Sequence, residues 1–577
     1  MRALVGISVV ALAMCSTPLA AQGADTIYTN ATVITVDDDS SIAEAVAVEN
    51  GLILAVGSAE EMAALADSET EIVDLGGLPL LPGFFDNHAH LGGPLQPWKY
   101  GGWISELPEW TRGVNTIPEL LEALAEKAAN TPDGEWIVGA ISREEWHNGS
   151  LPGRLDFDAV APNNPVAIDR GPHTLLVNSL AFEIAGITSE TEAEGGEFVV
   201  GPDGELTGKV LESARRMIYD VMPPEALDTV SDDEERLAEW RMLLNQLVDL
   251  GITSVNVAGI RPEQLPLVEE LYNRWGDEFP RATIQLRLWP GHDHHADVEF
   301  GTMQSIAELE AIGDRRAVFT HPKLSMGAVK MSIDGGLSAP IMWTTAPYES
   351  RPGFHGEQRI PDSVFYRVAL RAKQLGWQLG IHTMGDGAVD MVVDQLERIY
   401  EEVPDHIERD YLHHVAVRPS DETMRQMGDL GINVASQPGF LLSLGSYADE
   451  ALHPVDEAHQ DPSRSLMNHG IRVSYGSDAG PYGPISALYA GVTRRGWNDV
   501  VHGASEAVTV GEAIRMHTYE PAYFTFREGA QGTIEPGKVA DLVVLSANPF
   551  EVDPVRIQDI VVERTIVGGD ELYIRSE

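Results

Sequence analysis

Residues 81–90 read Leu81-Pro82-Gly83-Phe84-Phe85-Asp86-Asn87-His88-Ala89-His90, and this stretch decides the fold. An apolar run ends in two histidines that are separated by one residue. Because alternate residues of an extended strand share a face, both imidazoles can reach one metal ion. Active sites of barrel enzymes are built at the C-terminal ends of the strands. The stretch therefore predicts the first strand of a (β/α)8 TIM-type barrel, with His88 and His90 as metal ligands.

The residues that follow alternate apolar strands with amphipathic helices, which is typical of α/β proteins. Helices are predicted over residues 117–129, 234–250, 362–375 and 388–402. Barrel strands are predicted to end near Asp86, Val255, Lys330, His382, His414, Ser436 and Ser477. The stretch from about 95 to 211 is too long for one loop. We expect it to form an inserted subdomain that could close over the barrel mouth.

Both ends of the chain are rich in short, alternating, β-branched segments. They cover residues 27–36, 45–48, 52–57, 71–75, 540–545 and 565–569. Turn residues separate these segments at the spacing of β-hairpins. We expect residues 24–80 and 530–577 to form one small β-sandwich domain, and residues 81–529 to form the barrel with its insertion.

The first residues predict a signal peptide over residues 1–23. Met1 and Arg2 precede an apolar run that ends at Met14, and small residues follow up to Ala21. The run is too short to span a bilayer comfortably. Cys15 follows Met14, where lipoprotein signals carry a small residue, so lipoprotein anchoring is not expected. The sequence therefore predicts a secreted or periplasmic protein.

The composition limits the chemistry and the partners. Cys15 is the only cysteine, so a metal site in the mature chain must use histidine and oxygen ligands. The formal net charge is -50, from 89 acidic and 39 basic residues, and such a field repels nucleic acids. No later stretch is long and apolar enough for a membrane helix. The expected partner is a small-molecule substrate, and the sequence leaves a homo-oligomer open.

Four further residues at predicted strand ends have side chains suited to metal binding or proton transfer. They are Lys330, His382, His414 and Asp478. A lysine in an apolar strand is costly to bury as a cation, so it either extends its ammonium to the strand end or is carbamylated by CO₂. Residue type alone favours the extended ammonium, whereas the presence of the other predicted ligands favours the carbamate. The histidines could equally be buried core residues, and Asp478 suits a general base.

The motifs together resemble amidohydrolase family 3, which includes N-substituted formamide deformylases and YtcJ-like hydrolases. The matching segments are 82–90, 165–179, 330–335, 382–386, 414, 476–478 and 537–542, in the family's order. The resemblance runs from about Thr26 to the C-terminus. It implies a barrel whose metal ligands are His88, His90, carbamylated Lys330, His382, His414 and Asp478.

The resemblance also bears on three histidine assignments. It selects His414 as the ligand rather than His413, which is expected to pack against or orient a neighbour. His173 lies in the insertion at a family position, where it could bind substrate or the oxyanion, or serve the structure alone. The cluster His292, His294 and His295 follows a strand in a polar loop, and we expect a solvated loop there.

Histidine and oxygen donors suit zinc, as one or two ions, although manganese and iron remain open.

Residues 336–343 depart from the family pattern, so the substrates of relatives do not carry over. Trp343, Trp98 and Trp146 could form an apolar substrate wall, or they could be ordinary packing residues; both readings stand equally.

The sequence thus predicts a metal-dependent hydrolase of a carbon–nitrogen bond in an amide, formamide, carbamate or cyclic amide. A metal-activated water would attack the acyl group, with Asp478 as its general base. The rivals are an ester or lactone hydrolase at the same site, a metal-dependent isomerase or lyase, and a non-catalytic periplasmic binding protein. Pure binding does not need a water-activating aspartate, which argues against the last of these.

Overall fold

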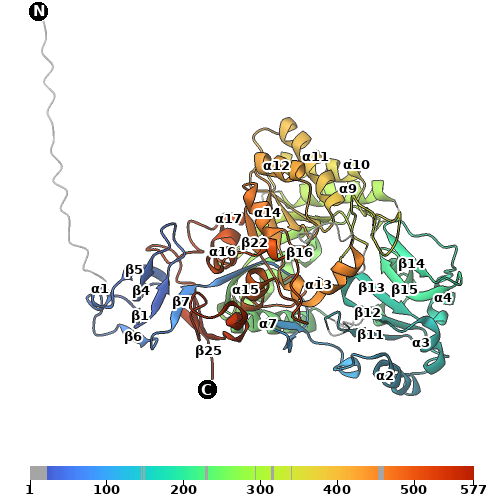
Figure 1. Cartoon of the computed structure of the whole chain (residues 1–577), viewed down its shortest axis with the longest axis horizontal. Helices are drawn as coiled ribbons and strands as arrows, with labels where there is room; N and C mark the ends of the chain where they lie inside the picture. Colours follow the sequence, from blue (N-terminus) through green and yellow to red (C-terminus); the bar gives the residue numbers. More distant parts are fainter. Residues whose placement is uncertain are drawn as a thin grey trace, which may run out of the picture.

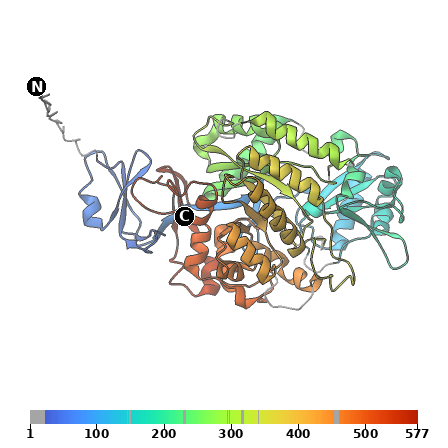
Figure 2. The ribbon, with the colours of Figure 1, turned by 90° about the horizontal axis from the view of Figure 1, so that it is seen from above.

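A computed structural model of the chain describes residues 23–576, except 145, 147–149, 228–231, 293, 296, 314–317, 339–340 and 453–459. Figure 1 shows three parts along the long axis of the molecule: a β-sandwich, a central barrel and an insertion. The sandwich and the insertion lie at opposite ends, and Figure 2 shows the same order from above. The predicted signal peptide falls almost wholly on residues 1–22, outside the described residues.

The centre is an eight-stranded parallel sheet in the order β22-β21-β20-β19-β18-β17-β16-β8. Its strands are β8 (Phe84–Ala89), β16 (Ile252–Ile260), β17 (Arg281–Arg287), β18 (Leu324–Ser332), β19 (Leu379–Thr383), β20 (Tyr411–His414), β21 (Asn433–Ser436) and β22 (Val473–Tyr475). A bridge between Ala89 and Asp478 joins the first strand to the last. The predicted α/β barrel is confirmed, and each of the seven expected strand ends falls within one of these strands or at most two residues after it.

The remaining strand, β17, has arginines at both ends and Gln285 in its middle. This polarity weakens its signal in the sequence, yet it pairs with β16 and β18 along its length. Outer helices cover the barrel, among them α7 (Asp233–Asp249), α8 (Leu265–Trp275), α9 (Val298–Ile312), α10 (Asp362–Gln374), α11 (Asp386–Glu402) and α12 (Asp421–Leu430). Each of the three predicted barrel helices lies within two residues of its observed bounds.

The insertion follows β8 and contains a sheet of its own. Its strands are β11 (Ile137–Ile141), β12 (Val166–Arg170), β13 (Thr174–Val177), β14 (Gly196–Val200) and β15 (Leu206–Glu212). Helices α2 (Ile117–Ala129), α3 (Arg154–Val160) and α4 (Ser179–Ala185) complete two small apolar cores. The short helices α5 (Arg215–Tyr219) and α6 (Pro224–Leu227) follow before α7, so the segment continues beyond residue 211.

The two ends of the chain share one β-sandwich. A four-stranded sheet holds β5 (Leu52–Gly57), β4 (Ala45–Glu49), β1 (Thr26–Thr29) and β6 (Glu71–Asp74). A six-stranded sheet holds β25 (Asp570–Ile574), β24 (Val562–Val567), β23 (Leu542–Leu545), β7 (Pro79–Pro82), β2 (Thr32–Ile34) and β3 (Ile42–Ala43). Tyr28, Val46, Leu80 and Leu542 are among the residues buried between the sheets.

The sandwich is joined directly to the barrel through Gly83, which lies between β7 and β8. Its backbone nitrogen donates to the carbonyl of Asp541, at 2.8 Å, and an added Cβ would meet Thr253 at 2.2 Å. The sandwich therefore fixes where the first barrel strand begins. None of the helices in the described part of the chain has the length and apolar character needed to cross a membrane.

Candidate active site

The C-terminal ends of the barrel strands surround a cavity of about 400 Å³. Its walls include His88, His90, Lys330, His382, His414 and Asp478. Pro172, His173 and Arg215 from the insertion complete it, so the insertion forms part of the mouth. All six predicted ligand residues therefore reach one cavity, although they come from five separate strands.

The tightest group consists of His88, His90 and Asp478. The Oδ1 atom of Asp478 lies 3.0 Å from Nε2 of His90 and 3.5 Å from Nε2 of His88. Among the described residues, these three form the group of histidine and acidic side chains whose ligand atoms converge closely enough to hold an ion. The His-x-His pair at the end of β8 thus meets the carboxylate that follows β22.

The other three residues adjoin this group. The Nζ atom of Lys330 lies 3.4 Å from Nε2 of His88. On the next two strands, Nε2 of His414 lies 2.9 Å from Nδ1 of His382. Gln437 lies between two of the rings, with Oε1 2.5 Å from Nδ1 of His414 and Nε2 3.2 Å from Nδ1 of His88. One amide side chain therefore orients imidazoles from β8 and β20.

The donor set fits a divalent metal. Two donors bound at about 2.0–2.1 Å to one tetrahedral ion lie roughly 3.3 Å apart, which is close to the separations found here. The amide oxygen of Gln437 accepts from Nδ1–H of His414, so the lone pair of Nε2 points toward His382. Two imidazole nitrogens at 2.9 Å need a proton or a cation between them. His88, His90, Asp478, Lys330, His382 and His414 would hold the ion or ions.

Burial lowers the pKa of three histidines of this site, His88, His382 and His414, and so favours their neutral form. It lowers the pKa of His414 to about 3 and the pKa of His382 well below its usual value, with a further contribution from neighbouring positive charges. Burial and the charge of Arg287 also lower the pKa of Lys330 well below its usual value. Neutral imidazole is the metal-binding form of histidine, and a neutral amine is the form that can react with CO₂.

Asp478 behaves in the opposite way. Burial raises the pKa of its carboxyl, but the hydrogen bond and charge of His90, with His414 and Arg143, outweigh burial and bring the pKa well below its usual value. Asp478 has a left-handed backbone, with φ 56°, and so does His414, with φ 74°. These conformations turn both side chains at the points where their strands end, a cost that functional sites commonly carry.

Asp86 ties the first and last strands together below the site. Its carboxylate accepts from Oγ of Ser477 at 2.6 Å, and from the backbone nitrogens of Ser477 and His88 at 3.0 Å each. Gly476 allows this approach, because an added Cβ would lie 2.4 Å from the nitrogen of His88. Asp86 thus holds the segments that carry His88 and Asp478 in register.

Asp334 performs a similar task beside His382. Its buried carboxylate accepts from the backbone nitrogens of Trp343, Met384 and Gly385, at 3.0, 2.9 and 2.8 Å. Burial nevertheless raises its pKa to about 7. The Lys-x-x-x-Asp-Gly motif therefore joins the β18 loop to the turn after His382.

His413 faces away from the cavity and packs inside the barrel. Its ring contacts His88 edge-on, with centroids 4.2 Å apart, and its Nε2 lies 3.0 Å from Oε1 of Gln285. It is not among the cavity residues, whereas His414 is. This placement supports the choice of His414 as ligand.

His173 approaches the cavity from the insertion, held by a buried acid. Its Nδ1 lies 2.9 Å from Oε1 of Glu212, which also accepts from the backbone nitrogen of Gly336 at 2.8 Å. Arg359 lies 3.6 Å from the same carboxylate. Burial raises the pKa of Glu212, but His173 and Arg359 outweigh burial and lower it to about 2. The Glu212 pairing was not expected from the sequence, where it lies 39 residues from His173.

The three tryptophans for which a substrate wall and ordinary packing were equally open are not among the residues that line this cavity. Trp98 is buried in the barrel core, Trp146 is buried in the insertion, and Trp343 packs on the β18 loop beside Gly387. Trp289 is the tryptophan among the described cavity residues. It lies three residues before His292 in the cluster His292, His294 and His295, whose members contact Glu194, Trp289 and Phe300, respectively.

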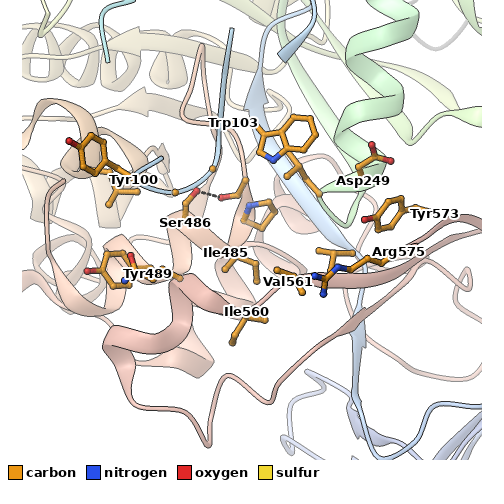
Figure 3. A pocket seen from close by; sticks show the side chains of 18 residues that line it. Tyr100, Trp103, Asp249, Ile485, Ser486, Tyr489, Ile560, Val561, Tyr573 and Arg575 are labelled. Carbon is orange, nitrogen blue, oxygen red and sulfur yellow. Dashed lines mark hydrogen bonds between the residues drawn. The ribbon is translucent and has the colours of Figure 1, made fainter. Parts of the chain in front are cut away.

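A second cavity, of about 380 Å³, lies where α7, α15 (Pro484–Thr493) and the C-terminal strands meet. Figure 3 shows aromatic and aliphatic side chains around it, among them Tyr100, Trp103, Tyr489 and Tyr573. None of the predicted ligand residues lines it. The chemistry predicted from the sequence therefore belongs to the cavity at the strand ends.

A parallel eight-stranded barrel whose strand ends bring histidines, a lysine and a carboxylate to one cavity is typical of barrel enzymes, which carry their active sites at this face. A sequence model of the amidohydrolase family matches residues 71–573. The chain therefore belongs to the amidohydrolase family. The predicted family is confirmed, and so is the prediction of a metal-dependent enzyme that hydrolyses carbon–nitrogen bonds, at the level of this family.

Individual relatives agree with this assignment. The N-substituted formamide deformylase of Arthrobacter pascens is 30% identical over 564 residues, which cover 96% of this chain and 99% of that protein. A Bacillus subtilis (strain 168) protein named YtcJ is 27% identical over 94% of this chain and 98% of its own length. An uncharacterized metal-dependent hydrolase from Pyrococcus horikoshii OT3 has the same fold, with a TM-score of 0.66, 21% identity, and coverage of 92% of this chain and 99% of that one.

Proposed function

We propose that the chain hydrolyses the amide-type carbon–nitrogen bond of a small molecule, using a divalent metal, Asp478 as general base and His173 as a substrate-binding residue. One observation carries the proposal: at the mouth of the barrel, Oδ1 of Asp478 lies within 3.5 Å of Nε2 of both His88 and His90, and the three residues offer donor atoms within 4.8 Å of one another. The formamide deformylase relative makes N-substituted formamides the first compounds to test.

A bound divalent ion, for which zinc is the proposed identity, would lower the pKa of water to near ~7 and polarise the scissile carbonyl. Asp478 then accepts the proton of the attacking water and returns it to the leaving nitrogen. Its lowered pKa keeps the carboxyl ionised, which is the form that can accept a proton. Because Glu212 engages Nδ1 of His173, Nε2 remains available to the substrate carbonyl.

The proposal includes a carbamate on Lys330. The Nζ lone pair attacks the carbon of CO₂, the nitrogen loses a proton, and the product is a carboxylate that supplies two oxygen donors. Burial lowers the pKa of Lys330, which favours the amine form that this reaction needs. We also propose, from the sequence of residues 1–23, that the enzyme is exported after cleavage of a signal peptide.

The test combines metal analysis with a substrate panel. The purified enzyme is expected to contain a divalent metal and to hydrolyse N-substituted formamides or other amides faster than the matching esters. Asp478→Asn should lower kcat by roughly 10²–10⁴-fold, the usual contribution of a general base. Asp499→Asn is the matched control, because Asp499 is an exposed carboxylate whose ion-pair contact with Arg495 is long, at 3.8 Å.

Two results would overturn the proposal. A protein free of metal that turns over neither amides nor esters would favour a binding role. Asp478→Asn with the activity of the wild type would remove the assigned base. Faster turnover of the esters would shift the assignment to an ester hydrolase at the same site.

A further inference from the structure

The cavity at the strand ends reverses the charge balance of the chain. Its described lining contains four arginines, Arg215, Arg261, Arg287 and Arg359, whereas Asp478 is its one carboxylate. The chain as a whole has 89 acidic and 39 basic residues. A cleft lined by one sign of charge focuses its field and concentrates ligands of the opposite sign.

Two of these arginines serve the architecture of the mouth. Arg359 lies 3.6 Å from Glu212 and donates to the carbonyl of Asp334. Arg215 donates to the carbonyl of Glu212 at 3.2 Å and lies 3.7 Å from Asp169. Arg359 therefore joins the insertion to the barrel, Arg215 braces the insertion itself, and the charges of both are partly balanced.

Arg287 is held in a fixed position at the end of β17. Its terminal nitrogen donates to Oγ of Ser332 at 2.9 Å, and its Cζ lies 3.8 Å from the centre of the Trp289 ring. The stem passes under Gly259, where an added Cβ would meet Cδ of Arg287 at 2.9 Å. A guanidinium stacked by its face on an aromatic ring presents its N–H edge, which matches carboxylate and phosphate oxygens in pairs.

Arg261 adds a second cation on the same side of the mouth. It follows β16, the neighbour of β17, and its side chain is half exposed. Its contact with the exposed Glu263 is long, at 3.9 Å, and such surface pairs contribute little. Going around the barrel in one direction, strands β16 and β8 lie between β17 and β22. In the other direction, strands β18, β19, β20 and β21 lie between them. Arg287 and Asp478 therefore lie across the mouth from each other.

We propose that the substrate carries an oxyanion, a carboxylate or a phosphate, that Arg287 binds together with Arg261 while the scissile amide lies beside Asp478. The inference rests on the proposed hydrolase function and names its substrate class: acidic amides such as N-acylated amino acids. A cavity of about 400 Å³ has the size of a small-molecule site. Arg287 is thus a specificity residue, separate from the residues that hold the metal or move protons.

The test compares compounds with and without an anion. N-formylphenylalanine and N-phenethylformamide differ by one carboxylate, and N-formylaminoethyl phosphate supplies the phosphate arm; the N-acetyl forms cover a larger acyl group. We expect an acidic compound to have the higher kcat/KM with the wild type. Arg287→Gln should lower kcat/KM for that compound roughly 10- to 100-fold, mainly through KM, as expected for loss of a charged hydrogen-bond pair. Arg287→Lys should recover part of it.

Neutral N-phenethylformamide should change less than about threefold in Arg287→Gln, because it lacks the group that the arginine binds and because burial, the larger cause, keeps the pKa of Lys330 low without Arg287. Arg367→Gln is the matched control, since Arg367 lies on α10 in an exposed ion pair with Glu299. Equal losses for the acidic and neutral compounds would mean that Arg287 only supports the site, and would overturn the inference. So would a wild type that prefers the neutral compound.

Calorimetric binding to the chelator-treated protein separates this inference from the proposed function. If no compound is hydrolysed but N-acetylphenylalanine binds and Arg287→Gln abolishes that binding, the anion site stands and the hydrolase assignment fails. If amides are hydrolysed and neither binding nor turnover depends on the anion, the hydrolase assignment stands and the anion site fails. A preference for the phosphate arm with the same dependence on Arg287 identifies the oxyanion as phosphate.

Discussion

The substitution Glu212→Gln tests how the insertion is attached to the barrel mouth. The Glu212 side chain is fully buried, and its carboxylate contacts His173, the backbone nitrogen of Gly336 and Arg359. Glutamine keeps the volume but removes the charge, which leaves Arg359 buried beside a neutral group. Breaking a buried pair in this way costs about 3–5 kcal/mol.

The pKa of Glu212 gives a second measure of this cost. It falls from 4.5 to about 2 in the folded protein, where His173 and Arg359 outweigh burial. That difference corresponds to about 3 kcal/mol of stabilisation, in agreement with the first figure. A carboxyl whose pKa is lowered on folding stabilises the protein above its unfolded pKa. The contribution of Glu212 is therefore complete at pH 7 and is lost as the pH falls from 4.5 toward 2.

Calorimetric melting at pH 7 and pH 4 is the appropriate assay. We expect Glu212→Gln to melt roughly 2–4 °C below the wild type at pH 7 and the gap to narrow at the lower pH. Glu205→Gln is the control, because Glu205 belongs to the same hairpin but is 68% exposed, 3.3 Å from Arg154. The reasoning is refuted if both variants melt together at pH 7, or if the gap widens in acid.

Two further predictions address the barrel. Lys330→Ala should lose bound metal and lower activity by at least about 100-fold. Added bicarbonate should restore neither the metal nor the activity, because alanine has no amine to carbamylate. A metal content equal to that of the wild type would contradict this prediction. Lys373→Met removes one partner of a buried ion pair with Asp410, at 2.7 Å, near the N-terminal end of β19 and away from the site. In urea denaturation, the free energy of unfolding of Lys373→Met should be about 3–5 kcal/mol lower than that of the wild type. The kcat of the folded variant should stay at the wild-type value. An unchanged free energy of unfolding would show that the ion pair contributes nothing to stability.

The strand ends could be predicted because each one combines a local hydrophobic run with a ligand-type residue. His88, Lys330, His382 and His414 follow this pattern, and all of them reach the cavity. The tryptophans carried no such local signal. A large aromatic residue is equally suited to a core and to a cavity wall, so Trp98 and Trp146 could not be distinguished from Trp289 by type.

The sequence by itself determined the alternation of strands and helices, the two β-rich ends and the residues placed at strand ends, because hydrophobic periodicity acts over a few residues. Only the tertiary structure decided which side chains meet. Glu212 and His173, Gln437 and the rings of His88 and His414, and the four arginines that line the cavity come together through contacts between distant segments. The physical reason is that barrel closure and packing of the insertion fix these distances, and neither is encoded in the spacing of residues along the chain.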